Sequence, residues 1–168
     1  MKRFILSALV LTLAVTVSYG QKTKAEKEAL AAALYEKAVA AITAKDFVII
    51  PDQYQKADGT TENSNDDFAF ISYENGVVYL QGSIVAGNNY TNRTSVSDFK
   101  QETDKKGNTK VTMKVTGSAI TAKVEISVKK GGNYADVIVT PTSGSQKVFS
   151  GELLPRGESK YRKRPNEV

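Results

Sequence analysis

Three acidic residues lie close together in this sequence and are the first candidates for chemistry: Asp98, Glu102 and Asp104. A glycosidase needs two carboxylates held on either side of the sugar bond that it cleaves. Enzymes of this kind usually also offer tryptophan platforms for the sugar, and the chain contains no Trp. We therefore interpret the three residues as surface charges. A hydrolase that uses carboxylates alone is the least favoured functional alternative.

A second acidic stretch offers oxygen ligands of the kind that calcium binds. Asp66 and Asp67 follow a run with several further oxygen donors: Asp58, Glu62, Asn63 and Asn65. Calcium takes six to eight oxygen ligands, and the spacing here does not match an EF-hand loop. We interpret the stretch as a hydrophilic loop and predict neither a metal site nor a cofactor.

Three residue types that dominate enzyme active sites and metal centres are missing from the chain. It has no Cys, no His and no Trp. Without Cys or His there is no thiol nucleophile, no imidazole base and no common ligand for zinc, haem or an iron–sulfur cluster. A serine nucleophile would need Lys as its base, and no G-x-S-x-G or S-x-x-K arrangement stands out. These absences favour a protein that is not an enzyme.

Aromatic residues are interleaved with the segments that we expect to form strands. Five of them are the candidates for a ligand-binding surface: Phe70, Tyr73, Tyr79, Tyr90 and Tyr134. Aromatic side chains on the concave face of a sheet can line a cavity for a small apolar ligand. They can equally fill the core, because small barrels pack their interior with side chains. The sequence leaves both interpretations open.

The positive charge is concentrated at the two ends of the chain. The formal net charge is +5, and removing Lys2 and Arg3 lowers it by two, to +3. Residues 156–168 form a basic C-terminal tail with five cationic side chains: Arg156, Lys160, Arg162, Lys163 and Arg164. No pattern of RNA-binding aromatic residues accompanies them. We therefore predict no nucleic-acid partner and interpret the tail as a solvated, poorly ordered terminus.

The first 20 residues have the pattern of a secretory signal peptide. Lys2 and Arg3 precede an apolar run over residues 4–17, and Ser18 and Gly20 are small residues at the −3 and −1 positions of a cleavage after Gly20. The apolar run is shorter than the ~20 residues that a transmembrane helix needs. The sequence predicts a mature chain that begins near Gln21, has no membrane span, and works in the periplasm or outside the cell.

Residues 22–45 predict an amphipathic helix. They are rich in Ala, Glu, Lys and Leu and contain neither Gly nor Pro. Large and small apolar residues recur at helical spacing along one face: Leu30, Leu34, Ala38, Ala41 and Ile42. We expect this face to pack on the rest of the domain.

After residue 45 the apolar residues alternate as they do in strands. We predict strands over residues 47–51, 68–74, 77–85, 109–116, 120–129, 134–140 and 147–153. Asn75-Gly76 is the strongest hairpin signal, residues 58–67 read as a polar loop, and residues 90–103 fit either a strand or a loop. The short connections exclude parallel crossovers, so the sheet should be antiparallel.

The sequence thus predicts a single α+β domain over residues 21–155, between the signal peptide (1–20) and the basic tail (156–168). An N-terminal helix packs on a curved, mainly antiparallel sheet, or on a partly open barrel, of about seven or eight strands.

The order of these features resembles the domain of unknown function 4251 family, which is found in exported proteins of Bacteroidetes. The resemblance rests on Lys45-Asp46-Phe47-Val48-Ile49, Asn75-Gly76-Val77, the Lys105-Lys106-Gly107 turn before residues 109–115, and Ser150-Gly151-Glu152-Leu153-Leu154-Pro155. It covers most of the mature chain. It implies an exported, bacterial, single-domain protein and supplies no catalytic residue.

We accordingly expect a non-enzymatic periplasmic protein that acts by binding or as a structural partner. Its partner is either another protein or a small apolar ligand held between the helix and the sheet.

The export signal makes a direct prediction about the mature protein. Native mass spectrometry of the protein purified from its own host's periplasm should give the mass of residues 21–168. The mass of the full chain would contradict cleavage after Gly20.

Overall fold

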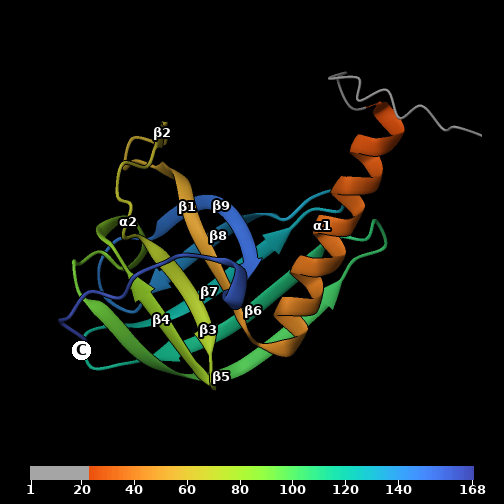
Figure 1. Ribbon diagram of the computed structural model, residues 1–168. Helices are drawn as coiled ribbons and strands as arrows, with labels where there is room; N and C mark the ends of the chain where they lie inside the picture. The colour runs from red at the N-terminus through yellow and green to blue at the C-terminus, as the bar shows by residue number, and fades with distance from the viewer. Residues whose placement is uncertain (1–22) are drawn as a thin grey trace, which may run out of the picture.

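The computed structural model describes residues 23–168, which form a closed antiparallel barrel with a helix across one end (Figure 1). The sequence predicted both the N-terminal helix and the curved antiparallel sheet, and both are confirmed. The nine strands are β1 (Phe47–Gln55), β2 (Thr61–Asn63), β3 (Phe70–Glu74), β4 (Val77–Gln81), β5 (Thr91–Thr103), β6 (Thr109–Thr116), β7 (Thr121–Val128), β8 (Tyr134–Pro141) and β9 (Lys147–Pro155). β1 pairs with both β3 and β9, so all strands except β2 close into a ring. The predicted signal peptide lies outside the described residues.

The barrel interior is filled by the apolar positions of the alternating strands. In β6 and β7 every second residue is buried, and the residues between them face outward. Val111, Met113, Val124 and Ile126 are completely inaccessible to solvent. Each such side chain contributes about 1.5–3 kcal/mol of transfer free energy. The core is therefore a continuous packed cluster drawn from nearly every strand.

Helix α1 (Lys24–Ala44) is held at both ends by local chemistry. Thr23 and Glu26 form a capping box at its start, and Lys45 ends it in the left-handed conformation. Only the second half of the helix is buried, through Ala38, Ala41 and Ile42. The two alanines are small enough to let the helix approach the barrel closely, and Ile42 is completely buried between helix and barrel. None of the helices in residues 23–168 combines the length and the hydropathy that crossing a lipid bilayer requires.

The hairpin of β3 and β4 follows the Asn75-Gly76 signal. Both turn residues have positive φ, 51° and 79°, as a two-residue hairpin turn demands. The predicted strand over residues 77–85 is wrong at its end, because β4 stops at Gln81 and helix α2 (Ser83–Ala86) follows. Gly82 makes this change, with φ of 103° and with Ala69 so close that a side chain would collide with it.

The prediction that Pro51 ends the first strand is also wrong. β1 continues to Gln55 past a register shift between Pro51 and Gln53 in its pairing with β9. Proline lacks an N–H and is tolerated in sheets at such bulges. Beyond the bulge β1 pairs with β2, which lies within the segment that the sequence indicated as a polar loop.

Residues 90–103, which fitted a strand or a loop, form β5 from Thr91 onward. Its pairing with β6 shifts register between Ser97 and Lys100, and Asp98 there has a positive φ of 54°. This bulge interrupts the side-chain alternation, which explains why the sequence pattern was ambiguous.

The C-terminal tail is packed against the barrel, so its interpretation as a solvated, poorly ordered terminus is wrong. After the short helix η1 (Arg156–Glu158), the chain crosses the outer side of β3 and β4 and ends beside the start of β5 (Figure 1). Side-chain contacts with acidic and aromatic residues hold it there, and they are described below. The sequence offered no local pattern that would reveal partners so distant in the chain.

Ring closure makes a prediction about Gly151, which faces Pro51 across the β1–β9 pair. A side chain at this position would overlap the backbone of Ile50. Gly151→Ala should lower the free energy of unfolding by about 1–3 kcal/mol, the usual cost of overpacking. Urea denaturation followed by circular dichroism measures the change.

Gly157→Ala is the matched control, because a side chain there would meet nothing within 4 Å. Equal urea midpoints for the two variants would contradict the proposed constraint at residue 151.

Candidate functional site

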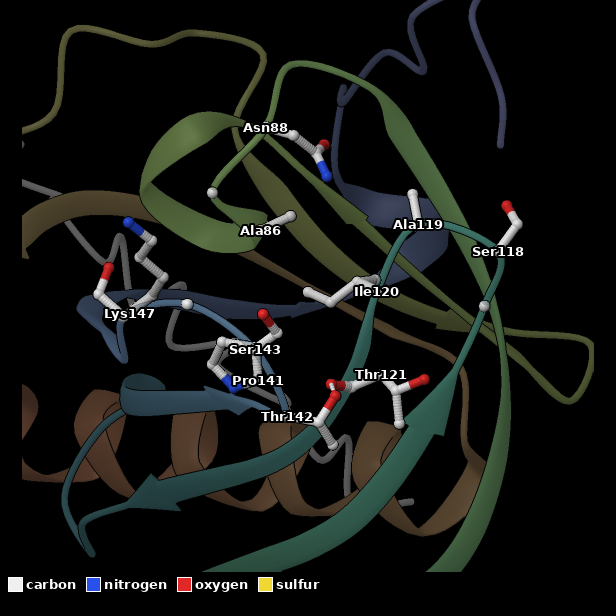
Figure 2. A pocket seen from close by; sticks show the side chains of 14 residues that line it. Ala86, Asn88, Ser118, Ala119, Ile120, Thr121, Pro141, Thr142, Ser143 and Lys147 are labelled. Carbon is white, nitrogen blue, oxygen red and sulfur yellow. Dashed lines mark hydrogen bonds between the residues drawn. The ribbon is translucent and has the colours of Figure 1, made fainter.

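The barrel end beside α2 carries a pair of adjoining surface hollows. The first, of about 470 Å³, lies between the end of α2, the β6–β7 turn (residues 117–121) and the β8–β9 loop (141–145) (Figure 2). The second, of about 680 Å³, lies between the end of β1 (54–57), the start of α2 and the start of β9. Ser145 and Lys147 line both hollows. We call the two together the Lys147 groove.

Lys147 reaches this groove because of its register in β9. Residues 149 and 153 of the strand are buried in the barrel core, and alternation places Lys147 on the same inward-facing side. At the end of the barrel this side opens onto the mouth. The lysine side chain passes close to Gly87, because a Cβ at Gly87 would be in van der Waals contact with Lys147 Cε, at 3.4 Å.

The charge of Lys147 is not neutralised within residues 23–168. Its half-buried side chain makes no hydrogen bond or ion pair there, and neither hollow is lined by a carboxylate. Lys56, the other cation of the groove, pairs with Glu62 at 3.0 Å. A unit charge near a protein surface attracts an opposite charge 4 Å away by about 4 kcal/mol before desolvation. The groove is therefore suited to an anion.

Hydroxyl groups without a partner line the same groove as the lysine. Within the described chain, five hydroxyl side chains lining the groove have no hydrogen-bond partner: Ser83, Ser118, Thr121, Ser143 and Ser145. Ile120 and Pro141 add an apolar surface between them, as Figure 2 shows. Polar side chains thus make up much of the wall, and a few well-placed polar groups are what fix the orientation of a bound small molecule. The arrangement fits a small anion that also carries hydroxyl groups.

The five aromatic residues predicted as a ligand-binding surface are not brought together. Tyr73 lies in the core, with its ring centroid 6.0 Å from that of Phe47 and 5.8 Å from that of Phe99. Phe70 and Tyr79 lie outside the barrel under the C-terminal tail. Tyr90, 46% exposed, lies in the turn before β5.

Tyr134 lies on the outside of the barrel at the start of β8. Its hydroxyl donates a hydrogen bond to the Asp52 carboxylate at the β1 bulge. Burial and this hydrogen bond both raise the pKa of Tyr134, so the phenol stays protonated and links β8 to β1. This contact is structural and lies apart from the Lys147 groove.

The carboxylates considered for hydrolysis take part in surface contacts. Asp98 pairs with Lys114 at 3.4 Å, and Asp104 accepts hydrogen bonds within the β5–β6 turn. Hydrogen bonds from Asn108 are the main reason that the pKa of Asp104 lies below its usual range. Such an acid remains ionised at neutral pH and is a poor proton donor. Glu102 lines a separate hollow of about 350 Å³ at the other end of the barrel.

The acidic loop residues point to different partners. Asp58 accepts from Thr60, Glu62 from Lys56 and Tyr54, and Asp66 from Arg164. In residues 23–168 no three acidic side chains gather in a position to hold a metal ion.

Comparison with known proteins assigns the chain to a family. The model of the family described as Domain of unknown function (DUF4251) matches residues 29–153. The chain belongs to the DUF4251 family. The resemblance noted in the sequence is thereby confirmed.

A DUF4251 family protein from Bacteroides eggerthii DSM 20697 has a similar crystal structure. It is 29% identical, with a TM-score of 0.69, and the match covers 79% of this chain and 94% of that chain. No curated protein sequence matches the chain. Family membership brings no activity, so a functional argument for this DUF4251 protein depends on the geometry of its surfaces.

Sequence reasoning missed Lys147. One signal was present, because the inward-facing positions 149 and 153 of the predicted strand continue to a lysine at 147. In this barrel the lysine at the start of the strand lies at the mouth. That the mouth contains hydroxyl groups and no carboxylate depends on loops far apart in sequence.

The carboxylate of Glu74 lies beside Phe70 and Tyr79, and its ionisation affects the stability of the protein. Glu74, 9% exposed, accepts hydrogen bonds from Ser72 and Tyr161 and pairs with Lys163. Burial alone would raise the pKa of Glu74, but its bonds to Lys163, Tyr161 and Ser72 outweigh burial and lower it.

A lowered pKa in the folded state stabilises the protein above the unfolded pKa, and this contribution is lost as pH falls through the folded value. Glu74→Gln should therefore cost about 1.5–3 kcal/mol at neutral pH, the value of hydrogen bonds to a charged group. The difference from the parent chain should shrink as pH falls from about 6 to about 3. Urea unfolding at each pH measures it, and a difference that does not change with pH would contradict the role of the ionised carboxylate.

Proposed function

We propose that this DUF4251 protein is an exported, non-enzymatic binding domain that holds a small hydroxylated anion in the Lys147 groove. The observation that carries the proposal is the unneutralised Lys147 amine in a groove without carboxylates. An anion that binds there displaces water from the Lys147 amine and accepts a charge-assisted hydrogen bond from it instead. Acidic sugars and phosphorylated polyols have this combination of charge and hydroxyl groups.

The filled interior favours a surface site over a carrier of apolar ligands. Ala38, Ala41 and Ile42 of α1 belong to the same packed cluster as the strand residues. A ligand between helix and sheet would have to displace these contacts, at a cost of several kcal/mol for each large side chain moved. The hollows of the Lys147 groove need no such rearrangement.

A binding role is also favoured over catalysis. The chain has no His and no Cys, and each carboxylate that shows a pKa shift within residues 23–168 has it lowered. A general acid at neutral pH needs a raised pKa.

Export rests on the signal pattern of residues 1–20, and a Gram-negative periplasm is the compartment that we propose.

The Lys147 groove predicts a charge-dependent interaction. Glucuronate and inorganic phosphate, titrated into ¹⁵N-labelled protein, should shift the amide signals of residues 117–121 and 143–147. Lys147→Gln should weaken binding of both probes at least about tenfold, which corresponds to 1.4 kcal/mol. Two-dimensional NMR gives both the site and the dissociation constant.

Lys105→Gln is the matched control, because it removes one positive charge from an exposed lysine in the β5–β6 turn. It should leave the affinity unchanged at fixed ionic strength. Equal weakening by the two substitutions, or shifts spread over the whole surface, would overturn the proposed site.

A further inference from the structure

The C-terminal residues lie in a groove that is built around them. After η1, residues 159–168 cross β3 and β4 in an extended path (Figure 1). We call this segment the strap. The surface beneath it, which we call the cradle, comprises Asp66, Phe70, Ser72, Glu74, Tyr79, Gln81 and Thr91. Phe70, Ser72 and Glu74 alternate with core residues of β3, so the cradle is the outer face of the sheet.

Tyr161 is the aromatic anchor of the strap. Its ring lies against Phe70 with centroids 4.7 Å apart, and its hydroxyl donates to Glu74 at 3.0 Å. Phe70 is only 1% exposed although it faces outward, because the strap covers it. Without an occupant the cradle would expose a large aromatic side chain to water.

Two cationic side chains of the strap meet acidic and aromatic partners. Lys163 Nζ lies 3.3 Å from the centroid of the Tyr79 ring and 3.0 Å from the Glu74 carboxylate. Arg164 reaches Asp66 at 3.1 Å. The cradle thus recognises an aromatic residue followed, two and three positions later, by two cations.

The cradle also binds the backbone of the strap. The completely buried Gln81 donates to the Arg162 carbonyl at 2.9 Å and accepts from the Arg164 N–H at 2.7 Å. Thr91, equally buried, donates through its hydroxyl to the Arg164 carbonyl at 3.1 Å. Buried polar groups that lose their partners cost about 1–3 kcal/mol each. The cradle therefore matches the backbone of an extended peptide, and the contacts would be the same for any chain with this sequence.

The last residues of the strap pair with the start of β5, along the part of its edge that β6 does not reach. Thr91 N–H donates to the Asn166 carbonyl and Arg93 N–H to that of Val168, at 3.0 and 2.8 Å. In return Val168 N–H donates to the Thr91 carbonyl at 3.0 Å. Added strand pairing of this kind is a general mode of peptide recognition.

Detachment of the strap would leave the strand pairing that closes the barrel intact. It follows all nine strands in sequence, and η1 remains held by ion pairs of Arg156 with Asp46 and of Lys37 with Glu158. Terminal segments are where local opening is easiest. A second copy of the chain carries the one sequence that the cradle is seen to fit.

We propose that the cradle is a peptide-binding site and that the strap of a second copy can occupy it in trans. Two copies that exchange straps would form a symmetric dimer with the same contacts as the monomer. Exchange of an identical element is a low-cost route to dimers.

The test uses a fluorescent peptide with the sequence of residues 159–168 and a free carboxyl end, titrated into the full chain by fluorescence anisotropy. Arg164→Ala and Tyr161→Ala, made separately, weaken the chain's own strap and leave the cradle intact. Both variants should bind the peptide saturably and at least tenfold more tightly than the parent chain, in which the tethered strap competes at high effective concentration. Circular dichroism confirms that each variant is folded.

Matched controls separate recognition from charge attraction. A peptide with alanine at the positions of Tyr161, Lys163 and Arg164 should not bind. Asp66→Asn, added to Arg164→Ala in the chain, should weaken binding of the unmodified peptide severalfold, because it removes the carboxylate that meets Arg164.

Sedimentation equilibrium of the parent chain provides a measurement without any variant. A dimer that grows with concentration, and that an excess of the peptide of residues 159–168 dissociates by occupying the cradles, supports exchange. Failure of both folded variants to bind the peptide, or equal binding of the alanine peptide, would overturn the proposal. A parent chain that stays monomeric up to millimolar concentration would overturn exchange between copies.

Discussion

The pairing of β1 with β9 is the constraint on which the rest of the molecule depends. It joins the first and last strands and removes the two free edges that an open sheet would leave. Gly151 permits the close approach of the two strands, and the β1 bulge at Pro51 allows pairing to continue past a residue without an N–H. α1 precedes β1 directly and η1 follows β9, so both are fixed at the same end of the barrel by this one pair.

Closure determines where binding can occur. A small eight-stranded ring is filled by its own side chains, and here α1 and α2 cover its two ends. Buried apolar side chains therefore occupy the interior, and the polar groups of the two proposed sites lie at the mouth and on the outer face. Lys147 is the first residue of β9 and lies on the inward-facing side of the strand, beyond the last buried core residues. Its cationic group therefore lies at the mouth and is only half-buried.

The two proposed sites differ in what neutralises their charges. On the outer face, Glu74 and Asp66 are matched by Lys163 and Arg164 of the strap, so the basic tail is used within the molecule. At the mouth, Lys147 has no such partner in the described chain. The cations of the tail are therefore engaged within the molecule, whereas one lysine in an ordinary strand is the basis of the anion site that we propose.

The sequence by itself determined the local structure of this protein. The helical period before residue 45, the alternation in β6 and β7 and the Asn75-Gly76 turn each depend on residues within one element, since backbone geometry sets their periods. The absence of His and Cys likewise limited the chemistry without any structure. Tertiary structure alone decided that the ring closes and that Pro51 and Asp98 lie at bulges. It alone also decided that the tail packs on Phe70, and that Lys147 has no charged partner within residues 23–168. Each of these depends on contacts between residues far apart in the chain, whose pairing no local periodicity encodes.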